Sequence, residues 1–247
     1  MELDGARCLV VGGGRGLGRE IALGLAAAGA GVAVSYRSSA APAAAAREAI
    51  ARLGVPAAAV AGDVGSAPGC RALVTAGADA LSGLDAVVFA ASGPFLPSAP
   101  EEIAEPVWDA SLDTIAKGFL FTAVAARERF AAQGGGGAVV AITDVLGWER
   151  PSALFAAHGA AKAAQVALVR SLAKAWGAEG VRVCGVAPGP LALADDLHPQ
   201  TPERGAARTA LGRPGDPAEI VRAVRFCLEN ESLTGTNLVV DGGLSLR

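Results

Sequence analysis

The sequence predicts an α/β fold built on one doubly wound parallel sheet of seven strands, with helices on both faces. Short apolar runs alternate with longer alanine-rich stretches of helical character along the whole chain. The apolar runs show no clear alternation of polar and apolar residues, which is typical of parallel strands covered on both faces. A strand–helix rhythm of this kind gives a single sheet with right-handed crossovers.

The first half of the chain supplies four of the predicted strands. RCLVV (7–11) is an apolar run that predicts a strand, and it is followed by a helical stretch at 16–29. Gly29 is expected to end this helix, because glycine is common just past a helix C-terminus. Further strands and helices are then expected in alternation, with strands at 31–36, 57–64 and 84–90 and helices near 41–53 and 68–81.

The second half of the chain continues the same rhythm with longer helices. Helices are expected near residues 102–132, 153–178 and 216–228, and strands at 137–143, 181–187 and 237–241. The glycine run at 134–137 is expected to form a turn rather than a linker, because a strand follows it directly.

Length and composition favour one domain over residues 1–247. A chain of 247 residues could form one large domain or two small ones, but it shows no internal repeat and no boundary. With 52% hydrophobic residues it can bury a sizeable core, and its many alanines and glycines suit helices packed closely on a sheet. A substrate lid is expected near residues 190–212, and His198 falls within it.

The charge and the apolar runs of the sequence argue against a nucleic-acid or membrane partner. The net charge is −3 and the basic residues form no block, so we expect no nucleic-acid partner. No apolar run reaches the roughly 20 residues that span a bilayer, and the N-terminus lacks the features of a signal peptide, so a cytoplasmic protein without a membrane partner is expected. The cysteines are far apart and are expected to be buried, reduced thiols: Cys8, Cys70, Cys184 and Cys227.

A glycine-rich turn follows the first predicted strand, in the sequence VGGGRGLG (11–18). Its glycines let the backbone turn sharply, and the helix that follows offers N–H groups and a positive dipole to a pyrophosphate. The turn alone is weak evidence, but its position after the first strand of a βα series predicts a dinucleotide site. The expected contacts in this turn are Gly12, Arg15, Gly16, Leu17 and Gly18.

The spacing of this turn resembles that of the short-chain dehydrogenases/reductases, although Val11 stands where that family usually has threonine. GDV (62–64), AASG (90–93), APGPL (187–191) and the C-terminal TGTNLVVDGG also resemble motifs of the family, in the same order. The resemblance covers nearly the whole chain and implies a Rossmann fold. It also implies further cofactor contacts at Asp63, Val64, Ala90, Gly93, Pro188, Gly189 and Leu191.

The type of cofactor is predicted from the end of the second strand. An NAD site places a carboxylate there to hold the ribose 2′-hydroxyl, but this chain has Tyr36 followed by Arg37 and Ser38. Two guanidinium groups, from Arg15 and Arg37, suit a 2′-phosphate, so NADPH/NADP+ is the expected cofactor. The alternative is that both are solvated surface arginines.

The resemblance also locates four catalytic positions, which the family fills with Asn, Ser, Tyr and Lys. Ile115 stands at the asparagine position, Asp144 at the serine position and His158 at the tyrosine position, and Lys162 alone is retained. The spacing leaves Val145 as a second match for the serine. In the family the tyrosine protonates the carbonyl oxygen, the lysine also holds the nicotinamide ribose, and the asparagine anchors a water relay.

The replacements differ in what they permit. Ile115 cannot hold a water, so the usual relay is expected to be broken, whereas Asp144 and His158 can each move protons near neutral pH. An imidazole is shorter than a phenol, so a substrate would sit deeper or a water would bridge. The catalytic candidates are therefore Asp144, His158 and Lys162, with a substrate-binding or passive role as the alternative for His158.

Three functions remain open from the sequence. The first is an atypical NADPH-dependent oxidoreductase that reduces a C=N group, an activated C=C group or an unusual carbonyl of a small organic substrate. The second is a redox-neutral enzyme on the same scaffold, such as a dehydratase, isomerase or cyclase, and the third is a non-catalytic NADP-binding partner subunit. Because the family commonly assembles through its two long helices, a homodimer or homotetramer is expected.

Overall fold

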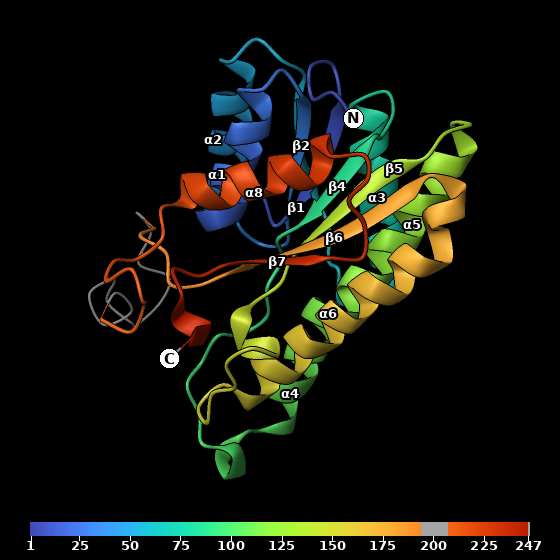
Figure 1. Ribbon diagram of the computed structural model, residues 1–247. Coiled ribbons are helices and arrows are strands. Elements are labelled where there is room, and N and C mark those ends of the chain that lie inside the picture. Colours follow the sequence, from blue (N-terminus) through green and yellow to red (C-terminus); the bar gives the residue numbers. More distant parts are fainter. Residues whose placement is uncertain (194–206, 247) are drawn as a thin grey trace.

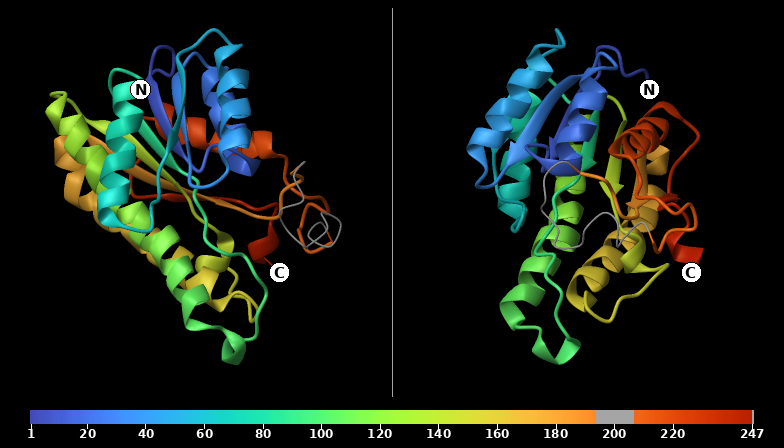
Figure 2. Two further views of the ribbon diagram at one scale, coloured as in Figure 1. Left: turned by 180° about the vertical axis from the view of Figure 1, so that it is seen from behind. Right: turned by 90° about the vertical axis from the view of Figure 1, so that its left-hand side faces the viewer.

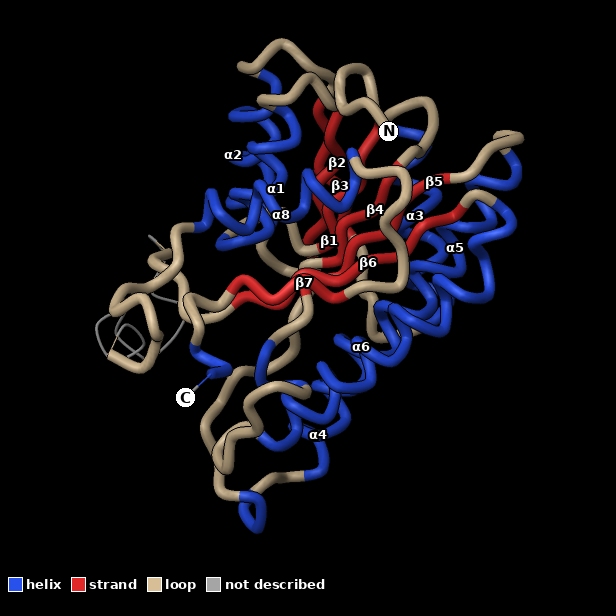
Figure 3. Tube along the Cα trace, viewed as in Figure 1, coloured by secondary structure: helices blue, strands red, loops and turns tan. Residues whose placement is uncertain are grey.

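The computed structural model describes residues 1–193 and 207–246, and these form one seven-stranded parallel sheet (Figures 1 and 3). The strand order is β3-β2-β1-β4-β5-β6-β7. This is the doubly wound Rossmann arrangement that the sequence predicts, with the crossover between the halves beside β1 and β4. The strands are β1 (Arg7–Val11), β2 (Gly31–Tyr36), β3 (Ala57–Ala61), β4 (Ala86–Phe89), β5 (Gly137–Ile142), β6 (Val181–Pro188) and β7 (Asn237–Val240).

Helices cover both faces of the sheet (Figures 1 and 2). One face carries α1 (Gly16–Ala26), α2 (Ala40–Ala51) and α8 (Pro217–Glu229). The opposite face carries α3 (Ala67–Ala80), α5 (Gly118–Ala132) and α6 (Ala156–Trp176). The chain also forms a short helix, α4 (Glu105–Ser111), a π-helical segment, η2 (Leu112–Lys117), and 3-10 turns η1 (Pro100–Glu102), η3 (Val145–Gly147), η4 (Gly177–Glu179) and η5 (Leu244–Leu246).

The central strands are buried on both faces, which explains their unbroken apolar sequence. In β1, Cys8 and Val10 point into the core under α1 and α8, while Leu9 and Val11 point into the core under α3 and α5. Both faces of the strand therefore need apolar side chains, and its sequence shows no alternation of polar and apolar residues. The four cysteines are free and buried, and burial raises the pKa of the Cys8 thiol to about 12.

The predicted elements are confirmed with changed boundaries. The first helix is shorter than expected, ending at Ala26, and Gly29 with φ +91° closes the turn that follows. The single helix expected at 102–132 is wrong at its start, because Pro106 in the first turn begins α4 at Glu105, and η2 follows without a break. Strands expected at 57–64 and 84–90 are shorter, and the helix expected from 153 begins at Ala156.

All seven strands run in one direction, so their carboxyl ends meet at one edge of the sheet. The glycine-rich turn follows β1 and Asp144 follows β5 at this edge, and Pro188 ends β6 there, where ligands of open α/β sheets bind. Part of the expected lid, with His198, lies outside the described residues. Within the described ranges, no helix is long and apolar enough to cross a membrane.

Two side chains, from β7 and from just after β5, meet over Gly185 of β6, next to the candidate site. The Thr143 hydroxyl donates to Asn237 Oδ1 at 2.6 Å, and the two side chains meet over Gly185. A Cβ at Gly185 would lie 2.2 Å from Asn237 Oδ1 and 3.2 Å from Thr143 Cγ2. Glycine is therefore required at this point of the strand.

Replacing this glycine tests the packing of β6. Gly185→Ala should lower the free energy of unfolding by about 1–3 kcal/mol, the usual cost of overpacking a close-packed interior. Gly177→Ala is the matched control, since nothing lies within 4 Å of its added Cβ and its φ of −55° is helical, and it should raise stability by about 0.4–1 kcal/mol. Urea unfolding measures both, and equal stability of the two variants would contradict the packing across β6.

Candidate functional site

The glycine-rich turn packs so closely that side chains are excluded from it. Gly12 has φ +79°, and a Cβ there would lie 2.9 Å from the Ala91 backbone nitrogen. A Cβ at Gly18 would lie 2.3 Å from the Gly12 carbonyl oxygen, so the turn can fold against α1 only with glycine. The Gly12 N–H donates to Ser35 Oγ at 3.1 Å, which ties the turn to the end of β2. Residues 12–18 therefore form a tight turn with little side-chain cover, which we call the cradle.

The N-terminus of α1 faces this cradle without a cap of its own. Arg15 precedes the helix in an extended conformation, and no side chain caps the first turn or places an acid there. The N–H groups and the dipole of an 11-residue helix thus remain available to an anion. Arg15 and Arg37 are both exposed, and neither forms an ion pair within the described ranges. These residues fit a pyrophosphate with a further phosphate beside it.

The other predicted cofactor residues surround the same edge of the sheet. Asp63 is exposed after β3, with Oδ1 accepting from the Gly65 N–H at 2.9 Å, while Val64 is buried. The Ala90 N–H donates to the Val11 carbonyl at 2.8 Å. A Cβ at Gly93 would lie 3.0 Å from Ser111 Cα, and one at Gly189 would lie 2.7 Å from Asp241 Cα, so both strand ends also demand glycine.

The segment that follows β6 pairs with the segment that precedes α8. Leu191 forms an isolated parallel bridge with Gly215, whose N–H donates to the Pro190 carbonyl at 2.8 Å. Leu17 is half-buried and Ser38 exposed, at the turn and at the end of β2 respectively. The predicted cofactor residues thus gather along the carboxyl edge of the strands.

Asp144 and His158 meet directly. The carboxylate follows β5, and its Oδ1 accepts from the Leu146 N–H at 2.8 Å, which fixes the side chain at the start of η3. Its Oδ2 lies 3.1 Å from His158 Nε2. Asp144 is 23% exposed and His158 is 5% exposed. Val145, the alternative match for the serine position, is buried against Ala187 and Leu244 and does not enter the site.

Lys162 lies one turn after His158 on α6, on the same helix face. Its side chain is buried, and Nζ donates to the Ile142 carbonyl at 2.6 Å and to Gln165 Oε1 at 3.3 Å. Burial lowers the pKa of this ammonium from 10.5 to about 8, and the nearby charge of Asp144 acts in the opposite direction. A cation is therefore held at the site at a high desolvation cost.

Ile115 is fully buried in the π-helical segment η2, which packs against α6. Its side chain has no polar atom, so it supplies no hydrogen bond at the position where the family has its relay asparagine, as expected from the sequence. π-Helical segments are frequent at functional sites, and this one shifts the helix phase beside the catalytic candidates.

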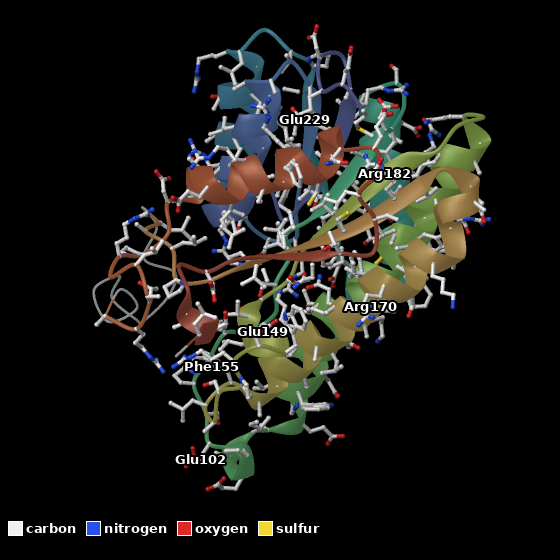
Figure 4. All side chains as sticks on the ribbon, viewed as in Figure 1. Glu102, Glu149, Phe155, Arg170, Arg182 and Glu229 are labelled. Atoms are coloured by element: carbon white, nitrogen blue, oxygen red, sulfur yellow. The ribbon has the colours of Figure 1, made fainter. Side chains whose placement is uncertain are left out.

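An apolar recess opens beside His158. It is lined mainly by apolar side chains, with Ser98 and Ser111 as polar exceptions. The ring of Phe95 stacks on Phe155 at a centroid distance of 4.2 Å and meets the His158 ring edge-on at 4.8 Å. The loop from η3 to α6 carries Glu149 and Phe155, both labelled in Figure 4, and the Ser98 N–H donates to the Leu154 carbonyl. The recess itself encloses only about 10 Å³, roughly the space of one water molecule, so its apolar side chains already pack against one another.

Three residues of this site were not expected from the sequence: Gln165, Phe95 and Phe155. Gln165 carries a usable signal, because it is a polar residue one turn past Lys162 on a helix rich in alanine and valine. The two aromatic residues lie 60 positions apart in the sequence, and no spacing rule predicts that they stack on one another.

Comparisons with known proteins agree with this architecture. A family model described as "Enoyl-(Acyl carrier protein) reductase" matches residues 11–245. The chain is 32% identical to L-rhamnose 1-dehydrogenase (NAD(P)(+)) of Sphingomonas sp. (strain SKA58), over 98% of this chain and 97% of that protein. It is 28% identical to (3R)-3-hydroxyacyl-CoA dehydrogenase of Mus musculus, over 99% and 98% of the two chains.

A solved structure extends the likeness to three dimensions. A short chain dehydrogenase from Burkholderia cenocepacia J2315, crystallised in complex with NADP, superposes with a TM-score of 0.90 at 31% identity. The match covers 99% of each chain. The similarity thus includes the whole sheet and its helices.

The buried lysine predicts a specific pH dependence of stability. Below pH 8, Lys162 is charged in the folded and unfolded chains, and the full burial penalty applies. Between about pH 8 and 10.5 the unfolded chain binds more protons, so stability rises with pH through this window. Relative to Lys162→Met, the wild type should gain on the order of 2–4 kcal/mol in this range.

Urea unfolding at pH 7, 8.5 and 10 measures this difference. Lys174→Met is the matched control, because Lys174 is exposed on the same helix, and its stability curve should run parallel to that of the wild type. A Lys162→Met curve that also runs parallel to the wild type would show that the ammonium is not desolvated.

Proposed function

The chain belongs to the short-chain dehydrogenase/reductase family, and from this premise we propose that it is an NADPH-dependent oxidoreductase in which Asp144 and His158 replace the usual serine and tyrosine. The observation that carries the proposal is the 3.1 Å contact between Asp144 Oδ2 and His158 Nε2, one helical turn before Lys162. The replacements form a hydrogen-bonded acid–base pair, which unrelated substitutions at two positions would not be expected to produce.

The cofactor assignment rests on the cradle and the two arginines. Gly12 and Gly18 allow the turn to pack closely at the N-terminus of α1, Gly16 has φ +53°, and the uncapped helix N-terminus would bind a pyrophosphate. Arg15 and Arg37 would offer planar charged donors for a 2′-phosphate. NADPH would supply the hydride when bound. Lys162 would hold the nicotinamide ribose through an N–H that its two protein acceptors leave free.

The pair has a preferred arrangement of its proton. With Asp144 ionised, its carboxylate accepts from the His158 Nε2–H, and Nδ1 carries a lone pair. In the other neutral tautomer Nε2 would carry a lone pair 3.1 Å from the Asp144 oxygen, while Nδ1 has no partner among the described residues in either tautomer. Because that tautomer loses the hydrogen bond to the carboxylate, the first arrangement is the more stable.

This arrangement favours a C=N group as the substrate. A fixed carboxylate at the position of the family's serine attracts a cationic iminium, and hydride addition to an iminium leaves no oxyanion to be protonated. Activated C=C groups and unusual carbonyls are the further candidates, for which the His158 imidazolium would supply the proton. The apolar side chains beside His158, including the stacked rings of Phe95 and Phe155, would contact the remainder of a small organic substrate.

Cofactor preference provides the first test. The wild type should bind NADPH more tightly than NADH. The single variants Arg15→Ala and Arg37→Ala should each weaken NADPH binding about 10- to 100-fold with little effect on NADH, since each lost contact is a charge-assisted hydrogen bond. Arg19→Ala is the control, because the Arg19 guanidinium pairs with Glu20 on α1. Fluorescence titration measures all four proteins. Equal affinity of the wild type for both cofactors would contradict the assignment of the two arginines.

Substitution of the pair provides the second test. Asp144→Asn removes the counter-charge for an iminium and His158→Phe removes the group that orients it, so each should lower kcat for a cyclic imine by about 10²- to 10³-fold while NADPH affinity stays near the wild-type value. Asp113→Asn, which removes the exposed partner of Lys117, should leave kcat unchanged. Deuterium from labelled NADPH should appear in the product. Turnover without deuterium transfer would instead support redox-neutral chemistry, and full activity of both variants would exclude the pair from catalysis.

A further inference from the structure

Gln165 is a buried polar residue that the packing of α6 does not require. It lies one turn after Lys162, on the helix face that packs against the sheet, and its side chain is fully buried. Its Oε1 accepts from Lys162 Nζ at 3.3 Å, but its Nε2 has no partner in the described part of the chain. An apolar side chain of similar volume would avoid the cost of this buried N–H group.

Lys162 has few other groups that stabilise its charge. Its Nζ is bonded to the Ile142 carbonyl and to Gln165, and no carboxylate of the described residues lies within ion-pair distance of it. On the η2 side, Ile115 presents only carbon atoms at the position where the family has a polar relay residue. Gln165 is therefore the side chain that directly accepts a hydrogen bond from the buried ammonium.

The charged groups around Lys162 are few. Asp144, after β5, and His158, on α6, face the same site, and of these Asp144 acts on the lysine through its charge. The remaining charged groups on elements packed against α6 bond elsewhere or are exposed, including Asp113 with Lys117 on η2, Arg127 with Glu179 on α5 and η4, and Asp109 on α4. On β6, Arg182 donates to carbonyls at the end of α8.

We propose that Gln165 is a positioning residue that holds the Lys162 ammonium in place and keeps it protonated while NADPH binds. The proposal rests on the proposed function for its cofactor, but the Gln165–Lys162 interaction itself does not. A carbonyl oxygen that accepts a hydrogen bond from the ammonium stabilises the charged form over the neutral amine. Removing it should make Lys162 lose its proton at lower pH.

The low lysine content of the chain allows a direct measurement. The sequence contains three lysines, Lys117, Lys162 and Lys174, and only Lys162 is buried. In protein labelled with ¹³Cε-lysine, the titration of Lys162 can be followed in the absence of cofactor, with Lys162→Arg to assign its signal. Gln165→Leu should lower the Lys162 pKa by about one unit, and Gln165→Glu should raise it, since a carboxylate is a stronger acceptor for an ammonium.

Thr122→Val is the matched control, because it removes another buried polar group beneath the same face of the sheet, on α5, and should leave the Lys162 titration unchanged. A cooperative urea-unfolding transition reports that each variant is folded. An unchanged Lys162 pKa in folded Gln165→Leu would overturn the proposal.

NADPH titrations of the same variants between pH 6 and 9 separate this inference from the proposed function. The pH at which NADPH affinity falls should be about one unit lower in Gln165→Leu than in the wild type and should be restored by Gln165→Glu, with similar affinity for all three at pH 6. A change in the Lys162 pKa without a matching change in NADPH affinity would show that Gln165 stabilises the ammonium but does not affect NADPH binding. Absence of NADPH binding by the wild type would overturn the proposed function while the ¹³C titration still tests the contact.

Discussion

The bond from Lys162 Nζ to the Ile142 carbonyl joins α6 to the carboxyl end of β5, and the arrangement of the candidate site depends on it. It fixes the register of the helix against the strand. Asp144 follows Ile142 by two residues, and His158 precedes Lys162 by one turn, so the same bond sets the distance between the carboxylate and the imidazole. A shift of α6 by one residue would rotate His158 by about 100° away from Asp144.

This register is maintained although it leaves polar atoms without partners. Two of the side chains with unpartnered buried nitrogens, His158 and Gln165, belong to this one face of α6. Elsewhere the fold follows local rules, as in α8, where Asp216 and Glu219 form a reciprocal capping box at the helix start. Costly polar burial concentrated beside one lysine is the pattern expected where a sequence is selected for a site rather than for stability.

The sequence was sufficient for the sheet, because parallel strands covered on both faces leave unbroken apolar runs such as RCLVV and GVAVSY, which match β1 and β2 in full. It was insufficient for the region before α5, since Pro106 fits the first turn of a helix as well as a loop, and no periodicity signals a π-helical segment. The positions of Asp144, His158 and Lys162 were predicted from motif spacing. Their mutual geometry was not, because a distance of 3.1 Å depends on rotamers and on the seating of α6 against β5.

The residues at the three changed positions, Ile115, Asp144 and His158, are together compatible with the proposed reduction of a C=N group. A tyrosine next to a lysine serves as a proton donor to an oxyanion, and a relay must then resupply the donor. A site for an iminium needs no such donor, because the product amine is neutral once the hydride has been added. In such a site Ile115 could replace the relay residue, the Asp144 carboxylate would serve as a counter-charge, and His158 would orient that carboxylate through its Nε2 contact. Under the proposed function the site would still require a charged Lys162 at the cofactor. Because Ile115 offers no polar group on the η2 side, Gln165 is the side chain in position to stabilise that charge.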